Sequence, residues 1–265
     1  MAGGWGMKIY CPKTPRHCAH SESDYIPSGI PQLDLAMEGG FPRGRLTVLA
    51  AYTGVGKTVT LCGFSDAMLT EGYKGVFMSY WGGNHVSSCL SAYMSGTACV
   101  GQDSRESDAQ GCKKLCHIDW FDRPKKLPLL ESLRDEMDKI DLDRVDFLMI
   151  DEINDDATGA RRCDYIEREA KYRATAEYLD SFARETGIAV VVAISSTHSA
   201  LCNKHNKPYY SCSSKRFSSS AKYFIGMSSL RELDEDNAPC GYLKNQFLSV
   251  YEGSRVKEHV PFVRW

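Results

Sequence analysis

The sequence contains no apolar run that approaches the roughly 20 residues needed to cross a bilayer. Its first 13 residues, MAGGWGMKIYCPK, lack the apolar core of a secretory signal. The formal net charge of −2 argues against a protein that is basic over its whole surface, but it allows a local basic segment. We therefore expect no membrane partner, and a cytoplasmic location or another reducing compartment.

The chain has 11 cysteines but no pair with the CxxC spacing typical of structural zinc sites. Without a secretory signal, reduced thiols are favoured over a disulfide framework. Two groupings combine cysteine with histidine, and the sequence leaves open whether they bind zinc or are unligated thiols. They are Cys11, Cys18 and His20, and Cys112, Cys116 and His117.

From Tyr25 onward, short apolar runs alternate with amphipathic segments. This pattern is typical of a three-layer α/β domain with a mostly parallel central sheet. We expect a polar arm over residues 1–24 and one α/β domain over residues 25–265, with a late β-hairpin at the sheet edge. The expected strands are 46–51, 75–80, 115–119, 147–151 and 188–195; the expected helices are 57–71, 128–140 and 160–186; the hairpin joins 242–251 to 257–264; residues 81–112 have no clear pattern.

The most informative segment is RLTVLAAYTGVGKT, residues 45–58, in which an apolar strand leads into a glycine-bearing turn and a helix. Backbone N–H groups in such a P-loop bind phosphate, Lys57 reaches the β- and γ-phosphates, and the Thr58 hydroxyl ligates Mg²⁺. The first glycine of the pattern is Ala51, which is tolerated where φ stays negative. The segment predicts an ATP site formed by Tyr52, Thr53, Gly54, Val55, Gly56, Lys57, Thr58 and Val59.

A second apolar strand, FLMI, ends in the two acids Asp151 and Glu152. Ligands of open α/β sheets lie at the carboxyl ends of the strands, so Asp151 is expected to hold Mg²⁺ through water. The alternative is an acidic turn after a buried strand. The next apolar strand leads into Thr197 and His198, which are candidates for sensing the γ-phosphate.

The run YIPSGIPQLD (25–34), followed by EGGFPRG (38–44) and the P-loop, resembles the opening of RecA-superfamily ATPase cores. The resemblance is closest to DnaB-type replicative helicases and more distant to KaiC-like proteins. It implies a RecA-like fold, ATP and Mg²⁺ binding, and a ring or filament with nucleotide between subunits. It also implies an ATP-driven motor on single-stranded DNA, with partners in replication or recombination. Ser195 to His198 match the family's sensor strand end.

Two departures from the family pattern affect catalysis. The family's catalytic glutamate position is Trp81 here, and no acid occurs between Glu71 and Asp103. Glu152 is the best substitute, which gives Lys57, Glu152 and His198 as the catalytic candidates. The late strand also lacks the cation that serves as a finger in the neighbouring subunit. Arg255 or Lys257 could take that role, although neither is well placed by pattern.

Residues 198–222 contain five lysines and arginines, no acid, and interleaved aromatic residues that include Phe217. Cations can hold phosphates and aromatic rings can stack on bases, which suits single-stranded DNA; the alternative is a solvated loop. Three functions stay open: a DNA motor, a mediator or loader that binds ATP and DNA without unwinding, and a KaiC-like signalling ATPase. The nucleic-acid candidates are Lys204, Lys207, Tyr209, Tyr210, Lys215 and Arg216.

Overall fold

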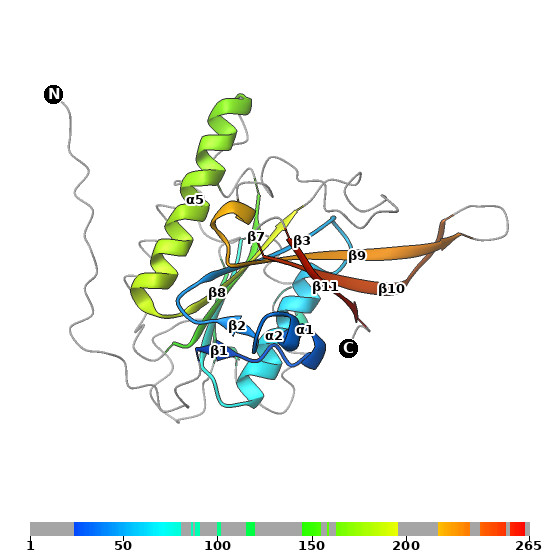
Figure 1. Ribbon diagram of the computed structural model, residues 1–265, viewed down its shortest axis with the longest axis horizontal. Coiled ribbons are helices and arrows are strands. Elements are labelled where there is room, and N and C mark those ends of the chain that lie inside the picture. Colours follow the sequence, from blue (N-terminus) through cyan, green and yellow to red (C-terminus); the bar gives the residue numbers. More distant parts are fainter. Residues whose placement is uncertain are drawn as a thin grey trace.

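The computed structural model describes a single sheet with helices on both faces and a small two-stranded sheet beside it (Figure 1). Within the described residues, no helix is both long and apolar enough to pass through a membrane. The residues described are 24–80, 86, 88–90, 100–101, 115–119, 145–154, 158, 163–195, 217–233, 239–252 and 255–262.

The main sheet has the strand order β11-β10-β9-β3-β8-β7-β4-β6-β5 within this part of the chain. Every neighbouring pair from β9 to β5 is parallel, whereas β10 pairs antiparallel with both β9 and β11. The expected mostly parallel sheet with an antiparallel hairpin at its edge is therefore confirmed. The strands are β3 (Leu46–Ala51), β4 (Gly75–Ser79), β5 (Val100–Gly101), β6 (Leu115–Asp119), β7 (Phe147–Ile153), β8 (Ala189–Ser195), β9 (Tyr223–Leu233), β10 (Pro239–Glu252) and β11 (Arg255–Phe262).

Helix α5 (Tyr165–Thr186) begins and ends where the local sequence provides caps. It begins after Asp164, whose side chain accepts a hydrogen bond from the Glu167 amide. It ends at Gly187, where φ of 69° suits glycine. The other elements are α1 (Pro31–Ala36), α2 (Lys57–Thr70) and the small sheet of β1 (Tyr25–Ile26) and β2 (Phe41–Pro42).

The central strands are buried on both faces because helices cover each side. In β8, Ala189, Val191 and Ala193 belong to the core cluster that contains α1 and α2 residues. The alternate residues Val190, Val192 and Ile194 belong to the cluster that contains α5 residues. In Figure 1, α5 accordingly lies on one side of the sheet, and α1 and α2 lie on the other. This continuous apolar character is what a covered parallel strand requires.

The structure differs from the expected elements in several places: β1, β2, β5 and α1 have no counterpart among them, and β7 continues to Ile153. Helix α5 begins at Tyr165 rather than at 160, because Asp164 is its cap. Strand β9 was not expected at all, although it pairs directly with β3. The hairpin begins at Pro239 rather than at 242. The expected helix 128–140, most of the arm 1–24 and nearly all of 81–112 lie outside the described residues.

Candidate nucleotide site

The carboxyl ends of three neighbouring strands bring the predicted site residues to one edge of the sheet. Strand β8 lies between β3, which leads into the P-loop, and β7, which carries the two acids. Ala51 at the end of β3 is level with Ser195 at the end of β8. Asp151 of β7 is level with Ser79 at the end of β4. The site is therefore built at the edge where ligands of open α/β sheets bind.

The turn after β3 has the backbone of a phosphate-binding loop. Gly54 and Gly56 have φ of 84° and 109°, values that side-chain-bearing residues rarely adopt. Val55 between them is buried in the core, which fixes the turn to the sheet. Ala51 is buried in β3, and among the described non-glycine residues only Glu38 has a positive φ. The alanine in place of the first glycine is therefore accommodated, as the sequence predicted.

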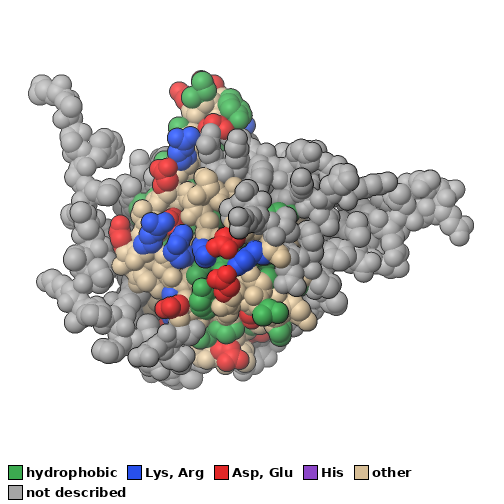
Figure 2. All heavy atoms as spheres, viewed as in Figure 1, with side chains coloured by type: hydrophobic (Ala, Val, Ile, Leu, Met, Phe, Trp, Pro, Cys, Tyr) green, Lys and Arg blue, Asp and Glu red, His purple; other side chains and the backbone are tan. Residues whose placement is uncertain are grey.

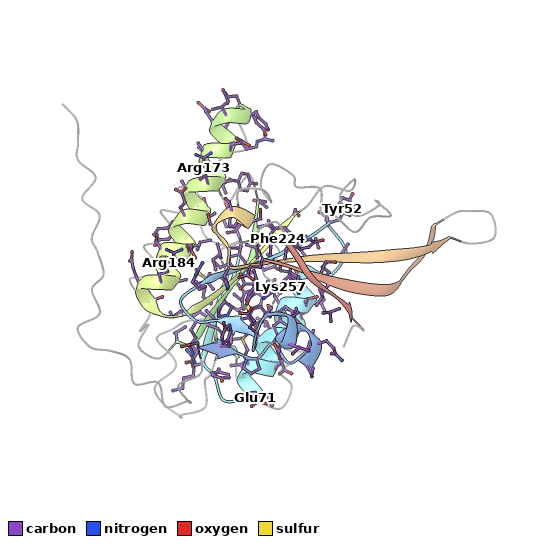
Figure 3. All side chains as sticks on the ribbon, viewed as in Figure 1. Tyr52, Glu71, Arg173, Arg184, Phe224 and Lys257 are labelled. Atoms are coloured by element: carbon purple, nitrogen blue, oxygen red, sulfur yellow. The ribbon has the colours of Figure 1, made fainter. Side chains whose placement is uncertain are left out.

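Helix α2 begins immediately after the turn, so its first residues face the same edge. Tyr52, at the start of the turn, and Glu71, just after α2, lie far apart at opposite ends of this strand–helix unit (Figure 3). An α-helix N-terminus carries partial positive charge and unpaired N–H groups, which favour an anion there. The loop and the start of the helix together have the backbone geometry expected of a phosphate-binding site.

The Lys57 side chain is only 5% exposed, and its amine is directed at three acceptors. Nζ donates to the Ala51 carbonyl at 3.3 Å and to Ser195 Oγ at 3.3 Å. It also lies 3.5 Å from Glu152 Oε2. A buried ammonium group is costly unless it is paired, and these three oxygens provide that compensation.

Thr58 and Asp151 meet directly: Thr58 Oγ1 donates to Asp151 Oδ2 at 2.7 Å. Asp151 is 2% exposed and is joined to Glu152 by a cis peptide bond. A hydroxyl oxygen and a carboxylate oxygen are the hard donors that Mg²⁺ prefers. The residues present thus fit the metal that the sequence predicted.

Glu152 is the acid that the sequence offered as a replacement for the missing catalytic glutamate. Its side chain is 24% exposed, so it is open to solvent on one side. Ser195 Oγ donates to Glu152 Oε1, while Oε2 faces Lys57. The structure therefore places a carboxylate in the same cluster as the P-loop lysine. Sequence reasoning had singled out Thr197 and His198 beyond this strand, and had given Ser195 itself no individual role.

Cys62 lies one turn along α2 from Thr58 and is fully buried. Burial raises the pKa of its thiol well above the ordinary value, and the nearby Cys89 and Asp151 raise it further. The thiol is therefore protonated at neutral pH and cannot act as a thiolate beside Asp151.

No group of three or more histidine, cysteine or acidic side chains within the described residues could hold a metal. The two zinc candidates depend on Cys11, Cys18, His20 and Cys112, which lie outside that part of the chain, and on Cys116 and His117, for which only the backbone is described. The zinc prediction therefore stays a prediction.

Most of the predicted nucleic-acid and sensor residues also lie outside the described part. They are Trp81, Thr197, His198, Lys204, Lys207, Tyr209, Tyr210, Lys215 and Arg216.

Two residues at the end of the basic segment have structural roles instead of facing a ligand. Phe217 is fully buried, and its ring packs edge-to-face on Tyr172 of α5 with the ring centroids 6.2 Å apart. Lys222 pairs with Glu252 and lies over the Tyr223 ring. Including Phe217 among the base-stacking aromatics was therefore wrong. Sequence reasoning missed this because the contact with Tyr172 depends on the fold.

The two candidate finger cations, Arg255 and Lys257, lie at the start of β11, at the end of the sheet opposite to the strand ends that carry the P-loop and the two acids. Tyr223 is level with Thr47 at the amino end of β3, the next residue Phe224 is opposite Tyr251 of β10, and Glu252 is opposite Arg255 of β11. Lys257 pairs there with Glu38 and, at 3.2 Å, with Glu252. Figure 2 shows basic and acidic side chains side by side across the middle of this view. For Arg255, only the backbone position at the start of β11 is described.

Comparisons with known proteins agree with this geometry. A family model for the AAA domain matches residues 11–199, which is well over half of the chain. The crystal structure of a KaiC-like protein from the hyperthermophilic archaeon Pyrococcus horikoshii OT3 matches with a TM-score of 0.58 and 18% sequence identity, over 90% of this chain and 94% of that one. The match confirms the RecA-like fold. The comparison with curated proteins finds no match.

Proposed function

The chain belongs to the AAA domain family, and from this premise we propose that it is an ATP-hydrolysing motor that acts on single-stranded DNA. Family membership and the RecA-like fold together indicate a nucleotide-binding P-loop ATPase. The finer proposal, a DnaB-type helicase or translocase in replication or recombination, rests on the sequence resemblance and on the site. The observation that carries the proposed hydrolysis is the Glu152 carboxylate beside Lys57.

Hydrolysis needs a group that orients the attacking water, and Glu152 is suited to that role. Its carboxylate is held from one oxygen by Ser195 and is partly open to solvent. A positioned carboxylate that accepts a proton from water contributes typically 10²–10⁴-fold to such a reaction. Glu152 thus supplies the acid that the sequence lacks after β4.

The remaining site residues bind and orient the triphosphate. Lys57 neutralises phosphate charge as a point cation, and the backbone of residues 52–56 offers N–H groups to the same anion. Thr58 and Asp151 would hold Mg²⁺ between them. When bound, the metal neutralises charge that develops on the phosphate oxygens.

Action on DNA is proposed from the position of the basic segment. Strand β8 ends at Ser195, at the edge that carries Lys57 and Glu152, and the basic segment begins three residues later in the sequence. Lys204, Lys207, Lys215 and Arg216 are proposed to hold phosphates, and Tyr209 and Tyr210 to stack on bases. A DNA strand bound by these residues would lie near the nucleotide. Such proximity is what coupling ATP hydrolysis to movement along DNA requires.

A mediator that binds ATP and DNA without turnover is the second candidate. It is favoured by the location of the finger candidates, because Lys257 is already paired with Glu38 and Glu252 within its own chain. Such a protein would keep the phosphate cradle but lack a cation to complete the site from a neighbour.

ATP turnover measured with and without single-stranded DNA separates the two candidates. We expect DNA to raise the rate of the wild type. Glu152→Gln should lower turnover by about 10²-fold or more while ADP still binds. Glu185→Gln, an exposed change on α5, is the matched control. Binding of ATP and DNA without turnover would support the mediator; a Glu152→Gln variant with wild-type turnover would refute the role of Glu152.

Self-association is proposed from the same resemblance, with ATP between subunits and the arm 1–24 packed on a neighbour. The monomer mass is 29.6 kDa. Light scattering with ATP, Mg²⁺ and single-stranded DNA present should give a multiple of this value. A monomer mass under those conditions would contradict the assembly, and an oligomer that survives deletion of residues 1–24 would contradict only the role of the arm.

A further inference from the structure

The first turn of α5 carries an aromatic ring that faces solvent. Tyr165 and Ile166 are 65% and 77% exposed, and Tyr165 is the only aromatic residue among the large hydrophobic side chains that stay exposed in the described part of the chain. Its hydroxyl donates to Glu169 Oε1 at 3.0 Å, one turn along the helix. This hydrogen bond helps to fix the orientation of the ring, while most of the ring surface stays open to solvent.

Tyr165 continues the face of α5 that packs on the sheet, but it lies beyond the part that is covered. Tyr172, seven residues later and therefore on the same face, is 4% exposed and is the first buried residue of the helix. The helix packs along the sheet and ends at Gly187, just before β8 begins at Ala189, so its start lies toward the carboxyl ends of the strands. Figure 1 shows the first turns of α5 projecting past the end of β7. The exposed ring is thus at the edge of the sheet that carries the nucleotide site.

The proposed DNA-binding segment ends on the same face of this helix. Phe217 directly follows Arg216, the last of the proposed nucleic-acid residues, and its ring packs on Tyr172 with the centroids 6.2 Å apart. A rise of 1.5 Å per residue places Tyr165 about 10 Å further along the helix axis. A DNA strand held by the cations next to Phe217 would therefore lie close to the Tyr165 ring.

We propose that Tyr165 is a stacking platform for a base of the same single-stranded DNA. The inference rests on the proposed function, because it adds a residue to the DNA contact proposed there. The faces of unpaired bases are accessible, and their stacking on an aromatic ring tolerates any sequence. The bases of a duplex are already stacked on each other, so Tyr165 would add affinity for single strands only.

The charges around Tyr165 indicate that its contribution is stacking and not attraction of phosphate. Between residues 164 and 173, the acids and the cations are equal in number. They are Asp164, Glu167, Glu169, Arg168, Lys171 and Arg173. Since the salt dependence of DNA binding comes from phosphates that cations neutralise, affinity gained by stacking should not change with salt. This separates Tyr165 from the cations of the basic segment, whose loss should reduce the salt slope.

Fluorescence anisotropy with an oligothymidine probe, and with an abasic probe of equal length, tests the inference. Tyr165→Ala should weaken oligothymidine binding at least about fivefold, the lower end for one base stacked on an aromatic ring, with an unchanged salt slope. On the abasic probe, the wild type and the variant should bind equally, because there is no base to stack. Tyr165→Phe keeps the ring and should bind oligothymidine within about twofold of the wild type. Leu35→Ala, which removes an exposed apolar side chain from α1, is the matched control.

The outcomes distinguish this inference from the proposed function. If the wild type does not bind oligothymidine, the proposed action on DNA fails, and the inference fails with it. If the wild type binds and Tyr165→Ala binds equally well, only the inference is overturned. An equal loss on both probes would mean that the change perturbs the fold or the phosphate contacts, and it would also overturn the inference. So would a lower molecular mass of Tyr165→Ala with unchanged DNA affinity, which would identify the ring as a contact between copies.

Discussion

Arg43 and Asp146, 103 residues apart in the sequence, form a partly buried ion pair with 3.0 Å between Nη2 and Oδ1. The other carboxylate oxygen, Oδ2, accepts the Lys74 amide at 2.9 Å, and the Asp146 carbonyl accepts the Ala189 amide at 3.0 Å. Asp146 thereby ties the segment before β3 to the amino ends of β4, β7 and β8.

Asp146→Ala should lower the free energy of unfolding by about 3 kcal/mol, because it leaves the Arg43 cation without its partner in a site that is 16% exposed. Urea unfolding followed by circular dichroism measures the loss. Glu185→Ala, an exposed acid on α5, is the control and should change stability by less than about 0.5 kcal/mol. A loss at Asp146 no greater than that of the control would contradict the structural role given to this pair.

Lys57→Ala should weaken ADP binding by about 10²-fold or more and should abolish ATP turnover, because it removes the cation that faces phosphate. The fold should persist, since Ser195 and Glu152 are open to solvent on one side and can be hydrated. Titration calorimetry measures the affinity, and circular dichroism checks the fold. Lys74→Ala, an exposed lysine before β4, is the matched control. Wild-type ADP affinity in the Lys57 variant would contradict the P-loop assignment.

Replacing Lys204, Lys207, Lys215 and Arg216 with alanine should weaken binding to single-stranded DNA. The slope of log affinity against log salt should fall by about 0.7 for each cation that contacted a phosphate. Fluorescence anisotropy over a series of salt concentrations measures both effects. A variant that lacks the exposed cations Lys74 and Arg173, the latter labelled on α5 in Figure 3, controls for net charge. Equal slopes for the two variants would indicate that the segment is only a solvated loop.

The cluster around Lys257 predicts a pH effect on stability. The hydrogen bond from Lys257 lowers the pKa of Glu38 from its ordinary 4.5, and the hydrogen bond from Lys222 does the same for Glu252. Groups with a lowered pKa in the folded state stabilise it above their unfolded pKa, and that stability is lost as pH falls through the folded pKa. The pKa of Lys257 is raised, so its own contribution is lost only at strongly alkaline pH.

We therefore expect the wild type to lose more stability than Lys257→Met between pH 6 and pH 3, as followed by thermal unfolding at each pH. Burial raises the pKa of Asp34, which works in the opposite direction, but this residue is common to both proteins and cancels in the difference. Parallel curves for the two proteins would show that the cluster contributes nothing to stability in this range.

The sequence predicted those parts of the site that depend on local pattern. Gly54, Gly56, Lys57 and Thr58 lie within one turn and one helix start, and Asp151 follows the apolar run of β7, so spacing alone points to them. The contact between Ser195 and Lys57 depends on which strand lies between β3 and β7, and strand order is a non-local property. A serine at a strand end carries no signal of that order.

Strand β9 was missed for a related physical reason. Its second half contains Ser228, Ser229, Arg231 and Glu232, which weaken the apolar alternation. It also follows a basic segment whose composition indicates a loop. Pairing with β3 on one side and β10 on the other makes it a strand. Tertiary pairing here outweighs local pattern.

The residues that flank the segment 196–216 have fixed places in the fold: Ser195 ends β8, and Phe217 packs on Tyr172 of α5. Ser195 is level with the end of β3, whereas Lys222, just past Phe217, donates its amide to Leu46 at the start of β3. The 22 residue steps from Ser195 to Phe217 can extend to about 75 Å at most, so the middle of this segment lies no further than about 38 Å from either residue. Single-stranded DNA bound by this segment, as proposed, would therefore stay within about 38 Å of Ser195, which contacts the P-loop lysine Lys57.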